Sequence, residues 1–134
     1  MTDLQLLLLA IEARKHSYAP YSSFHVGAAL LGKSGKVYTG CNVENAAYTP
    51  TNCAERTAVF KAVSEGEREF TAIAVVGGAG EAIAELCAPC GVCRQVLAEF
   101  CRGDLRVILG TPESITVSTL AELLPLSFGK SDLS

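Results

Sequence analysis

Four residues with catalytic chemistry fall at two apparent helix starts. Cys53 and Glu55 lie two positions apart in "TNCAERTAVF", and Cys90 and Cys93 lie three positions apart in "APCGVCRQVL". Residues three apart share a helix face, and the positive end of a helix favours the thiolate form of cysteine. Three thiolates from two helix starts can therefore bind one zinc ion. Because three protein ligands leave a position for water, Glu55 is the candidate to move the protons of that water.

Arg56 offers the charge compensation that such a cluster needs. Three thiolates on one divalent cation leave a net charge of about −1. Arg56 follows Cys53 by three positions, so the two side chains share a helix face and Arg56 is predicted to donate hydrogen bonds to sulfur. The alternative is a solvated surface arginine.

Cys87, the first cysteine of "CAPCGVC", leaves a second interpretation of the metal site open. With Cys53, Cys90 and Cys93 it would complete a closed structural site of four thiolates. Pro89, however, marks a helix boundary and places Cys87 before the helix, so helical spacing gives no reason to direct it at the metal. The open site with three ligands is favoured.

Glu55 also has a purely structural interpretation. It follows Asn52 by three positions, where the acid of a capping box stands. Beside an open zinc site, a carboxylate is also the group that hydrolysis requires, because it accepts the proton of water and passes it on. The catalytic interpretation is favoured, and the capping role stays open.

Charge and composition favour a cytosolic protein with a small, uncharged ligand. The chain has 134 residues, 49% of them hydrophobic, and a net charge of −3 from 11 basic and 14 acidic residues. No basic run is present that would hold a phosphate backbone, which argues against nucleic acid as a partner. The run "LLLLAI" is far too short to span a membrane, and "MTDLQ" before it lacks the basic residues of a signal peptide.

The six cysteines are predicted to stay reduced in the cytosol. They are then metal ligands or buried thiols, and Cys41 and Cys101 are predicted to be buried thiols. A secreted domain with three disulfides is the disfavoured alternative.

Hydrophobic periodicity and turn residues predict one α/β domain over 1–134. Thr2 and Gln5 have the spacing of a capping box, and a first helix is expected from there to about Ser17. The remaining elements, in chain order, are a β-hairpin at 24–43, a helix from Asn52 to Gly66, a buried strand at 70–78, a helix from Cys90 to Gly103, strands at 105–110 and 114–118, and a short helix at 119–125. This order predicts a mixed sheet with helices packed on its faces.

The motifs around the cysteines resemble one family of enzymes. "CAE" followed by "PCGVC" resembles the signature of the zinc-dependent nucleoside and nucleobase deaminases. The segments "YAPYSSFHVGAALL", "GCNVENAAYTPTNCAERTAVFKAVSEG", "PCGVCRQVLAEF" and "ELLP" extend the resemblance along nearly the whole chain, to the small homotetrameric cytidine deaminases with three cysteine ligands. The resemblance implies a three-layer α-β-α sandwich with a mixed five-stranded sheet.

The same resemblance implies a set of site residues. It assigns Cys53, Cys90 and Cys93 as ligands of one Zn²⁺ per subunit, and Glu55 as the proton shuttle. Phe24 is expected to pack on the pyrimidine, and the backbone N–H of Ala54 to donate to its 2-oxo group. The "NVEN" segment is expected to bind the ribose, mainly at the 3′-hydroxyl; its residues are Asn42, Val43, Glu44 and Asn45. Tyr48 and Phe128 are expected to complete the pocket from neighbouring subunits.

The implied reaction is the hydrolytic deamination of free cytidine and 2′-deoxycytidine to uridine and 2′-deoxyuridine, a step of pyrimidine salvage in the cytoplasm. A homotetramer with no nucleic-acid or membrane partner is expected. Two alternatives remain: a deaminase of a related aminopyrimidine nucleoside such as blasticidin S, and a noncatalytic binding module stabilised by zinc.

Overall fold

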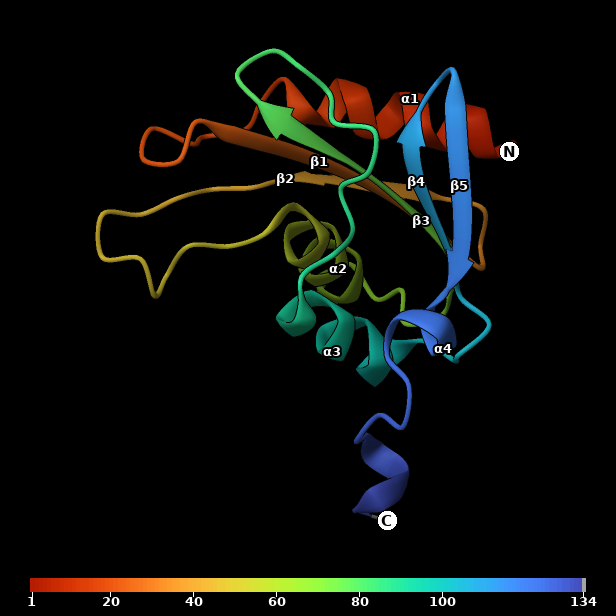
Figure 1. The fold of residues 1–134 in the computed structure, drawn as a ribbon. Helices are drawn as coiled ribbons and strands as arrows, with labels where there is room; N and C mark the ends of the chain where they lie inside the picture. The colour runs from red at the N-terminus through yellow and green to blue at the C-terminus, as the bar shows by residue number, and fades with distance from the viewer. Residues whose placement is uncertain (134) are drawn as a thin grey trace.

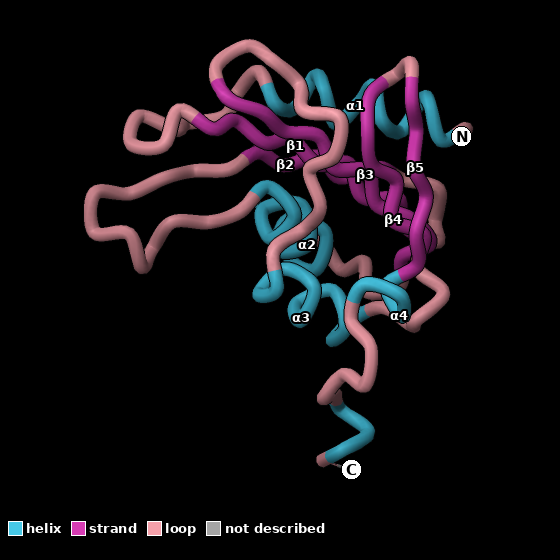
Figure 2. The backbone as a smooth tube through the Cα atoms, in the orientation of Figure 1, coloured by secondary structure: helices cyan, strands magenta, loops and turns pink. Residues whose placement is uncertain are grey.

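The structure is a computed structural model, and it describes residues 1–133. Figures 1 and 2 show its helices and strands in the same orientation. In chain order the elements are α1 (Asp3–Arg14), β1 (Phe24–Gly32), β2 (Val37–Cys41), α2 (Ala54–Ser64), β3 (Phe70–Ala79), α3 (Gly91–Phe100), β4 (Arg106–Thr111), β5 (Ser114–Thr119), α4 (Leu120–Leu123) and a 3-10 helix (Lys130–Asp132). The predicted hairpin, the later strands and the short last helix are all confirmed.

The sheet has the strand order β2-β1-β3-β4-β5. Among the strands of this sheet β3 and β4 pair in parallel, and the other three neighbouring pairs are antiparallel. Helix α1 covers one face of the sheet, while α2 and α3 cover the other (Figure 1). The predicted three-layer α-β-α sandwich with a mixed five-stranded sheet is therefore confirmed.

The central strand β3 is apolar and buried from Ala72 to Gly78, because helices cover both faces of the sheet there. Ile73 and Val75 belong to the core beneath α2 and α3, whereas Ala72 and Ala74 belong to the core beneath α1. A strand covered on both sides reads as a continuous hydrophobic run rather than an alternating one.

Two glycines let helices approach the hairpin closely. A Cβ at Gly27 would lie 2.0 Å from the carbonyl oxygen of Ala10 on α1. A Cβ at Gly40 would lie 2.5 Å from the carbonyl oxygen of Ala54, in the first turn of α2. Any larger residue at Gly40 would move the start of α2, which carries part of the candidate site.

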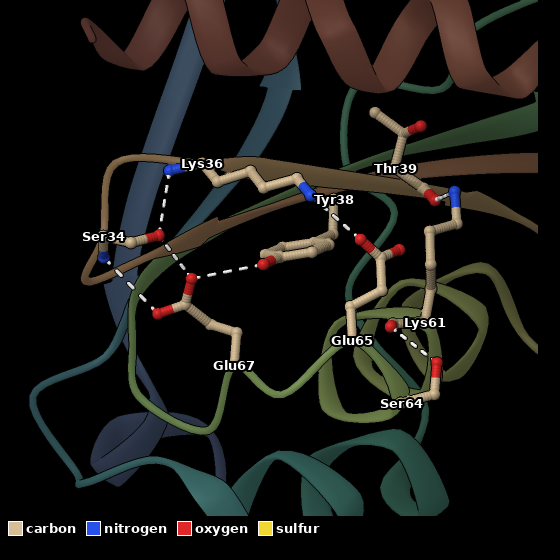
Figure 3. Close-up of polar contacts among 8 residues, drawn as sticks. All are labelled: Ser34, Lys36, Tyr38, Thr39, Lys61, Ser64, Glu65 and Glu67. Carbon is tan, nitrogen blue, oxygen red and sulfur yellow. Dashed lines mark hydrogen bonds and ion pairs between the residues drawn. The ribbon is translucent and has the colours of Figure 1, made fainter.

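Polar contacts hold the other end of α2 against the hairpin (Figure 3). Lys36 pairs with Glu65 at 2.9 Å, and Lys61 Nζ donates to the carbonyl of Thr39. After the helix, the Glu67 carboxylate accepts a hydrogen bond from the Tyr38 hydroxyl at 3.2 Å. Together with the packing at Gly40, these contacts fix both ends of α2 on the sheet.

Three predicted helix bounds were wrong by a few residues. Helix α1 ends at Arg14 rather than near Ser17, because the next three N–H groups bond to carbonyls three residues back, as in a tight 3-10 turn. Helix α3 ends at Phe100 because Cys101 is extended, with φ −127°. Helix α2 begins at Ala54, one residue later than a cap at Asn52 would require.

None of the helices between residues 1 and 133 has the length and apolar character that crossing a bilayer requires.

Candidate active site

Cys53 is the N-cap of α2, in place of the predicted Asn52. Its backbone is extended, with φ −76° and ψ 156°, and its carbonyl accepts the first helical hydrogen bond from Thr57 N at 3.0 Å. Asn52 is drawn out of the helix because its backbone pairs with Val43 in both directions at 2.9 Å. Its side chain instead donates to Thr57 Oγ1 at 3.1 Å. The non-helical geometry of Cys53 directs its sulfur off the end of the helix.

Cys90 occupies the equivalent N-cap position of α3. Its sulfur accepts a hydrogen bond from Cys93 N at 3.5 Å, so the two cysteines of this motif face each other across the first turn. Arg94 holds this helix start in place, since its Nε donates to Pro89 O and its Nη1 to Leu123 O, both at 2.7 Å.

The two helix starts bring the three sulfurs into one group. The Sγ atoms of Cys53, Cys90 and Cys93 all lie within 4.8 Å of one another, with Cys53 and Cys90 at 3.9 Å and Cys90 and Cys93 at 3.4 Å. Zinc–sulfur bonds of about 2.3 Å in a tetrahedron place sulfurs about 3.8 Å apart, so this spacing suits zinc. Within residues 1–133 Cys87 does not belong to the group.

Arg56 is directed at this group rather than at solvent. It is half-buried, and its Nη2 donates to Cys53 Sγ at 3.2 Å. Its Nε is buried and has no hydrogen-bond partner among residues 1–133. A half-buried guanidinium with an unused donor suits a cluster that becomes more negative when all three thiols ionise.

Hydrogen bonds within the group of three thiols shift their pKa values, and a bound cation would take the place of the shared protons. Hydrogen bonds from Cys93 and then from Arg56 lower the pKa of Cys53 to about 5. The same bond raises the pKa of Cys93, because its proton is held between the two sulfurs. A divalent cation would displace this proton and the thiol proton of Cys90, and so leave the three thiolates that zinc requires.

Glu55 lies in the first turn of α2 with a side chain that is almost fully enclosed. The residue is 4% exposed, and burial raises the pKa of its carboxyl to about 7. The helix is capped by Cys53 without a side-chain hydrogen bond, so the capping-box role of Glu55 is wrong. The structure thus places an acid that can both hold and release a proton near neutral pH beside the thiol group.

The "NVEN" segment runs beside the start of α2. Asn42 is buried at 9% exposure, whereas Val43 and Asn45 are exposed. Glu44 and Asn45 line a cavity of about 350 Å³ together with Tyr21, Ser22, Tyr48 and Thr51. A larger cavity of about 550 Å³ lies between α3, α4 and the C-terminal segment, and none of the predicted site residues lines it.

The predicted aromatic contacts are exposed in this chain. Phe24 starts β1 at 39% exposure, Tyr48 is 72% exposed, and Phe128 is 51% exposed. Tyr48 also has a positive φ of 62°. Phe128 follows α4 in the segment that leaves the body of the molecule (Figure 1), where its carbonyl accepts from Gln95 Nε2 at 2.8 Å.

All six cysteines are free, so the disulfide alternative is not supported. Cys41 and Cys101, predicted to be buried, are half-buried. The pKa of the Cys101 thiol is nevertheless raised to about 12 by burial, and that of Cys87 to about 11.

Sequence reasoning missed three residues that organise the site from outside it. Arg14 donates to five backbone carbonyls, those of His25 and of residues 78, 80, 81 and 82, and so fixes the start of the segment that leads to Cys90. Ser17 Oγ donates to Asn42 Oδ1, and His25 Nδ1 bonds to Ser17 Oγ. These contacts join segments far apart in the chain, so no local pattern signals them.

The chain resembles proteins of one family in sequence and in structure. The family described as "Cytidine and deoxycytidylate deaminase zinc-binding region" matches residues 1–111. A cytidine deaminase of Sporosarcina psychrophila is 52% identical over 97% of this chain and 93% of its own length, and one of Halalkalibacterium halodurans is 52% identical over 98% of both.

Solved structures agree with this assignment. The crystal structure of cytidine deaminase from Burkholderia pseudomallei has a TM-score of 0.88 and 49% identity, over 96% of this chain and all of that one. The crystal structure from Mycobacterium tuberculosis has a TM-score of 0.80 and 41% identity, over 93% of this chain and 95% of that one. Together with the cluster of three thiols, these likenesses show that the chain belongs to the family of zinc-binding cytidine and deoxycytidylate deaminases.

Proposed function

We propose that this protein is a hydrolase that deaminates free cytidine and 2′-deoxycytidine to uridine and 2′-deoxyuridine, with release of ammonia. The observation that carries the proposal is the pairing of a buried carboxyl, Glu55, with three thiols at the same helix starts. Full-length relatives that carry the name cytidine deaminase support the choice of substrate.

Cys53, Cys90 and Cys93 would hold one zinc ion per chain. When bound there, zinc would act as a Lewis acid and lower the pKa of water enough for it to ionise at neutral pH. Because Cys87 lies outside the group, three protein ligands leave one position open for that chemistry. Arg56 would offset the negative charge of the thiolates through its bond to Cys53.

Glu55 would carry both proton transfers of the reaction. It accepts one proton from water and delivers it to ring N3, which makes C4 electrophilic, and it then moves the second proton to the departing amino group. Water supplies the oxygen that replaces nitrogen at C4, so the products are uridine and ammonia. Burial raises the pKa of this carboxyl and favours its uptake of a proton, while a zinc ion bound nearby would favour release of the proton, so the group suits transfer in both directions.

The remaining site residues would orient the nucleoside. Ala54 N–H is the first backbone donor of α2 and has no helical acceptor, so it is available to the 2-oxo group of the pyrimidine. Phe24 would pack on the ring, and Asn42 and Glu44 would bind the ribose, with Val43 and Asn45 completing that segment.

We also propose that one domain spans the chain and that four copies assemble. The exposure of Tyr48 and Phe128 supports this, because each could complete the site of a neighbouring subunit. Light scattering on the purified protein should give about four times the chain mass of 14.1 kDa. A cytoplasmic role in pyrimidine salvage fits a site that depends on reduced thiols.

The test is to mix purified protein with cytidine and follow ultraviolet absorbance and ammonia. We expect conversion to uridine, loss of activity with a zinc chelator, and recovery when Zn²⁺ is restored. Blasticidin S is the comparison substrate, and the relatives named above do not favour it. Turnover of blasticidin S alone would contradict the proposal, as would zinc-loaded, folded protein that releases no ammonia from either compound.

A further inference from the structure

Ser17 and His25 form a hydrogen-bonded chain behind the side chain of Asn42. Ser17 follows α1 and His25 lies on β1, and both residues are half-buried. Ser17 Oγ bonds to Asn42 Oδ1, and His25 Nδ1 lies 2.9 Å from Ser17 Oγ. Neither residue takes part in the proposed proton transfers or metal site, so this chain of hydrogen bonds needs another explanation.

Backbone groups fix which end of the Asn42 amide is oxygen. The N–H of Val26, which can only donate, lies 2.9 Å from Oδ1, and the carbonyl of Phe24, which can only accept, lies 2.8 Å from Nδ2. With bonds from Val26 and Ser17, both lone pairs of Oδ1 are used. Nδ2 has used one of its two N–H groups. The remaining capacity of the Asn42 side chain is therefore that of a donor.

The donor and acceptor of each hydrogen bond from His25 through Ser17 to Asn42 follow from this assignment. Because Asn42 Oδ1 only accepts, the Ser17 hydroxyl must donate its hydrogen to it. His25 Nδ1 must then carry a proton and donate it to Ser17 Oγ. Donors that end on an amide oxygen polarise the amide, which strengthens its free N–H as a donor.

Glu44 offers the opposite capacity two residues further along. Its Oε1 accepts from the backbone N–H groups of Tyr21 and Ser22 at 2.9 and 3.1 Å, and its Oε2 accepts from the Ser22 hydroxyl. These bonds, the Ser22 hydroxyl first, lower the pKa of Glu44 and keep it an acceptor. A hydroxyl both accepts and donates, so it can satisfy Asn42 and Glu44 together.

We propose that Ser17 and His25 are positioning residues that hold Asn42 as a donor to the ribose 3′-hydroxyl, and so set the preference for nucleosides that carry this group. The inference rests on the proposed function, since it requires Asn42 and Glu44 to bind the sugar. It predicts that removing the donor of Ser17 or of His25 weakens binding of the ribose 3′-hydroxyl and no other contact to the nucleoside.

The test compares cytidine with 3′-deoxycytidine in wild-type enzyme, Ser17→Ala and Ser17→Thr. With Ser17→Ala we expect kcat/KM for cytidine to fall about 3–10-fold, the size expected for one hydrogen bond, chiefly through KM. The kcat/KM for 3′-deoxycytidine should stay the same, so discrimination between the two substrates shrinks by the same factor. Ser17→Thr keeps a hydroxyl and should restore the wild-type ratio. Equal losses on both substrates, or an unchanged ratio, would overturn the inference.

Further variants at His25 and Asn42 separate the inference from a failure to fold. His25→Leu removes the donor to Ser17 and should shrink discrimination, whereas His25→Gln retains an N–H and should preserve more of it. In an Asn42→Ala background, Ser17→Ala should cause no further loss on cytidine; an additional loss would contradict action through Asn42. Wild-type protein that deaminates neither nucleoside contradicts the proposed function as well, whereas an active enzyme with an unaltered ratio contradicts this inference alone.

Discussion

Replacing Glu55 with glutamine tests two effects of burying an acid: its effect on the free energy of unfolding and its effect on catalysis. The ordinary carboxyl pKa of 4.5 is raised to about 7 in the folded protein, mainly by burial. Between these two values the folded protein binds more protons than the unfolded chain, so the free energy of unfolding falls as the pH rises. The difference of about 2.5 in pKa corresponds to about 3 kcal/mol at about 1.4 kcal/mol per unit.

The loss of stability is complete above about pH 7 and absent below about pH 4, where the carboxyl is protonated in both states. Glutamine has the same shape and no charge to bury. In the metal-free protein, Glu55→Gln should therefore raise the free energy of unfolding by about 3 kcal/mol near pH 8 and leave it unchanged at the acid end. With zinc bound, the nearby cation favours the carboxylate, so the gain should shrink.

Urea unfolding followed by circular dichroism over a pH series, with reductant and chelator present, measures this difference. Glu12→Gln is the control, because Glu12 is exposed and its ion pair is with exposed Lys15, so its curve should follow the wild type within about 0.5 kcal/mol. Parallel curves for wild type and Glu55→Gln across the whole range would refute the argument from burial.

The same variant should lose about 10²–10⁴-fold in kcat, the usual contribution of a general acid–base group. Zinc content should stay at one ion per chain, because no ligand is altered. Turnover within tenfold of the wild type would show that another group moves the protons.

Three further changes test separate contacts. Arg56→Gln removes a donor to Cys53 Sγ, so the pKa of Cys53 should rise and turnover should fall. Zinc uptake by the metal-free protein should then need a pH higher by about one unit. An uptake curve at the same pH as the wild type would contradict this role of Arg56. Cys87→Ser should keep full zinc content and activity, and loss of zinc on elemental analysis would revive the closed site of four thiolates. Gly27→Ala should destabilise the fold by about 1–3 kcal/mol or more in thermal unfolding, because its Cβ would lie 2.0 Å from Ala10 O. The control is Gly129→Ala, whose Cβ would meet no atom of residues 1–133 within 4 Å and should have little effect.

The features that the sequence predicts best are those that local spacing controls. Cys90 and Cys93 lie in one helical turn, so their shared direction follows from helix geometry alone. The strand β3 is equally readable, since burial on both faces requires an unbroken apolar run. The meeting of Cys53 with this pair, however, was expected from chemistry and resemblance, because local spacing says nothing about two helices brought together by a sheet.

The features that were missed depend on contacts between distant segments. Asn52 has a good capping side chain, but pairing of its backbone with Val43 removes it from the helix and transfers the cap to Cys53. Ser17 and His25 acquire their place only when β1 lies beside the Asn42 segment. No periodicity within a single element carries that information.

The errors at α2 fall where the site departs from the most stable local choice. An N-cap without a side-chain hydrogen bond gives up about 0.5–2 kcal/mol relative to serine or aspartate. Cys53 occupies this position without such a bond, which leaves its sulfur free to face Cys90 and Cys93. Enclosing Glu55 lowers stability further at neutral pH, because burial raises the pKa of its carboxyl to about 7 in the metal-free protein. Rules of helix stability fail at these two positions, which hold the residues proposed to bind zinc and to move protons.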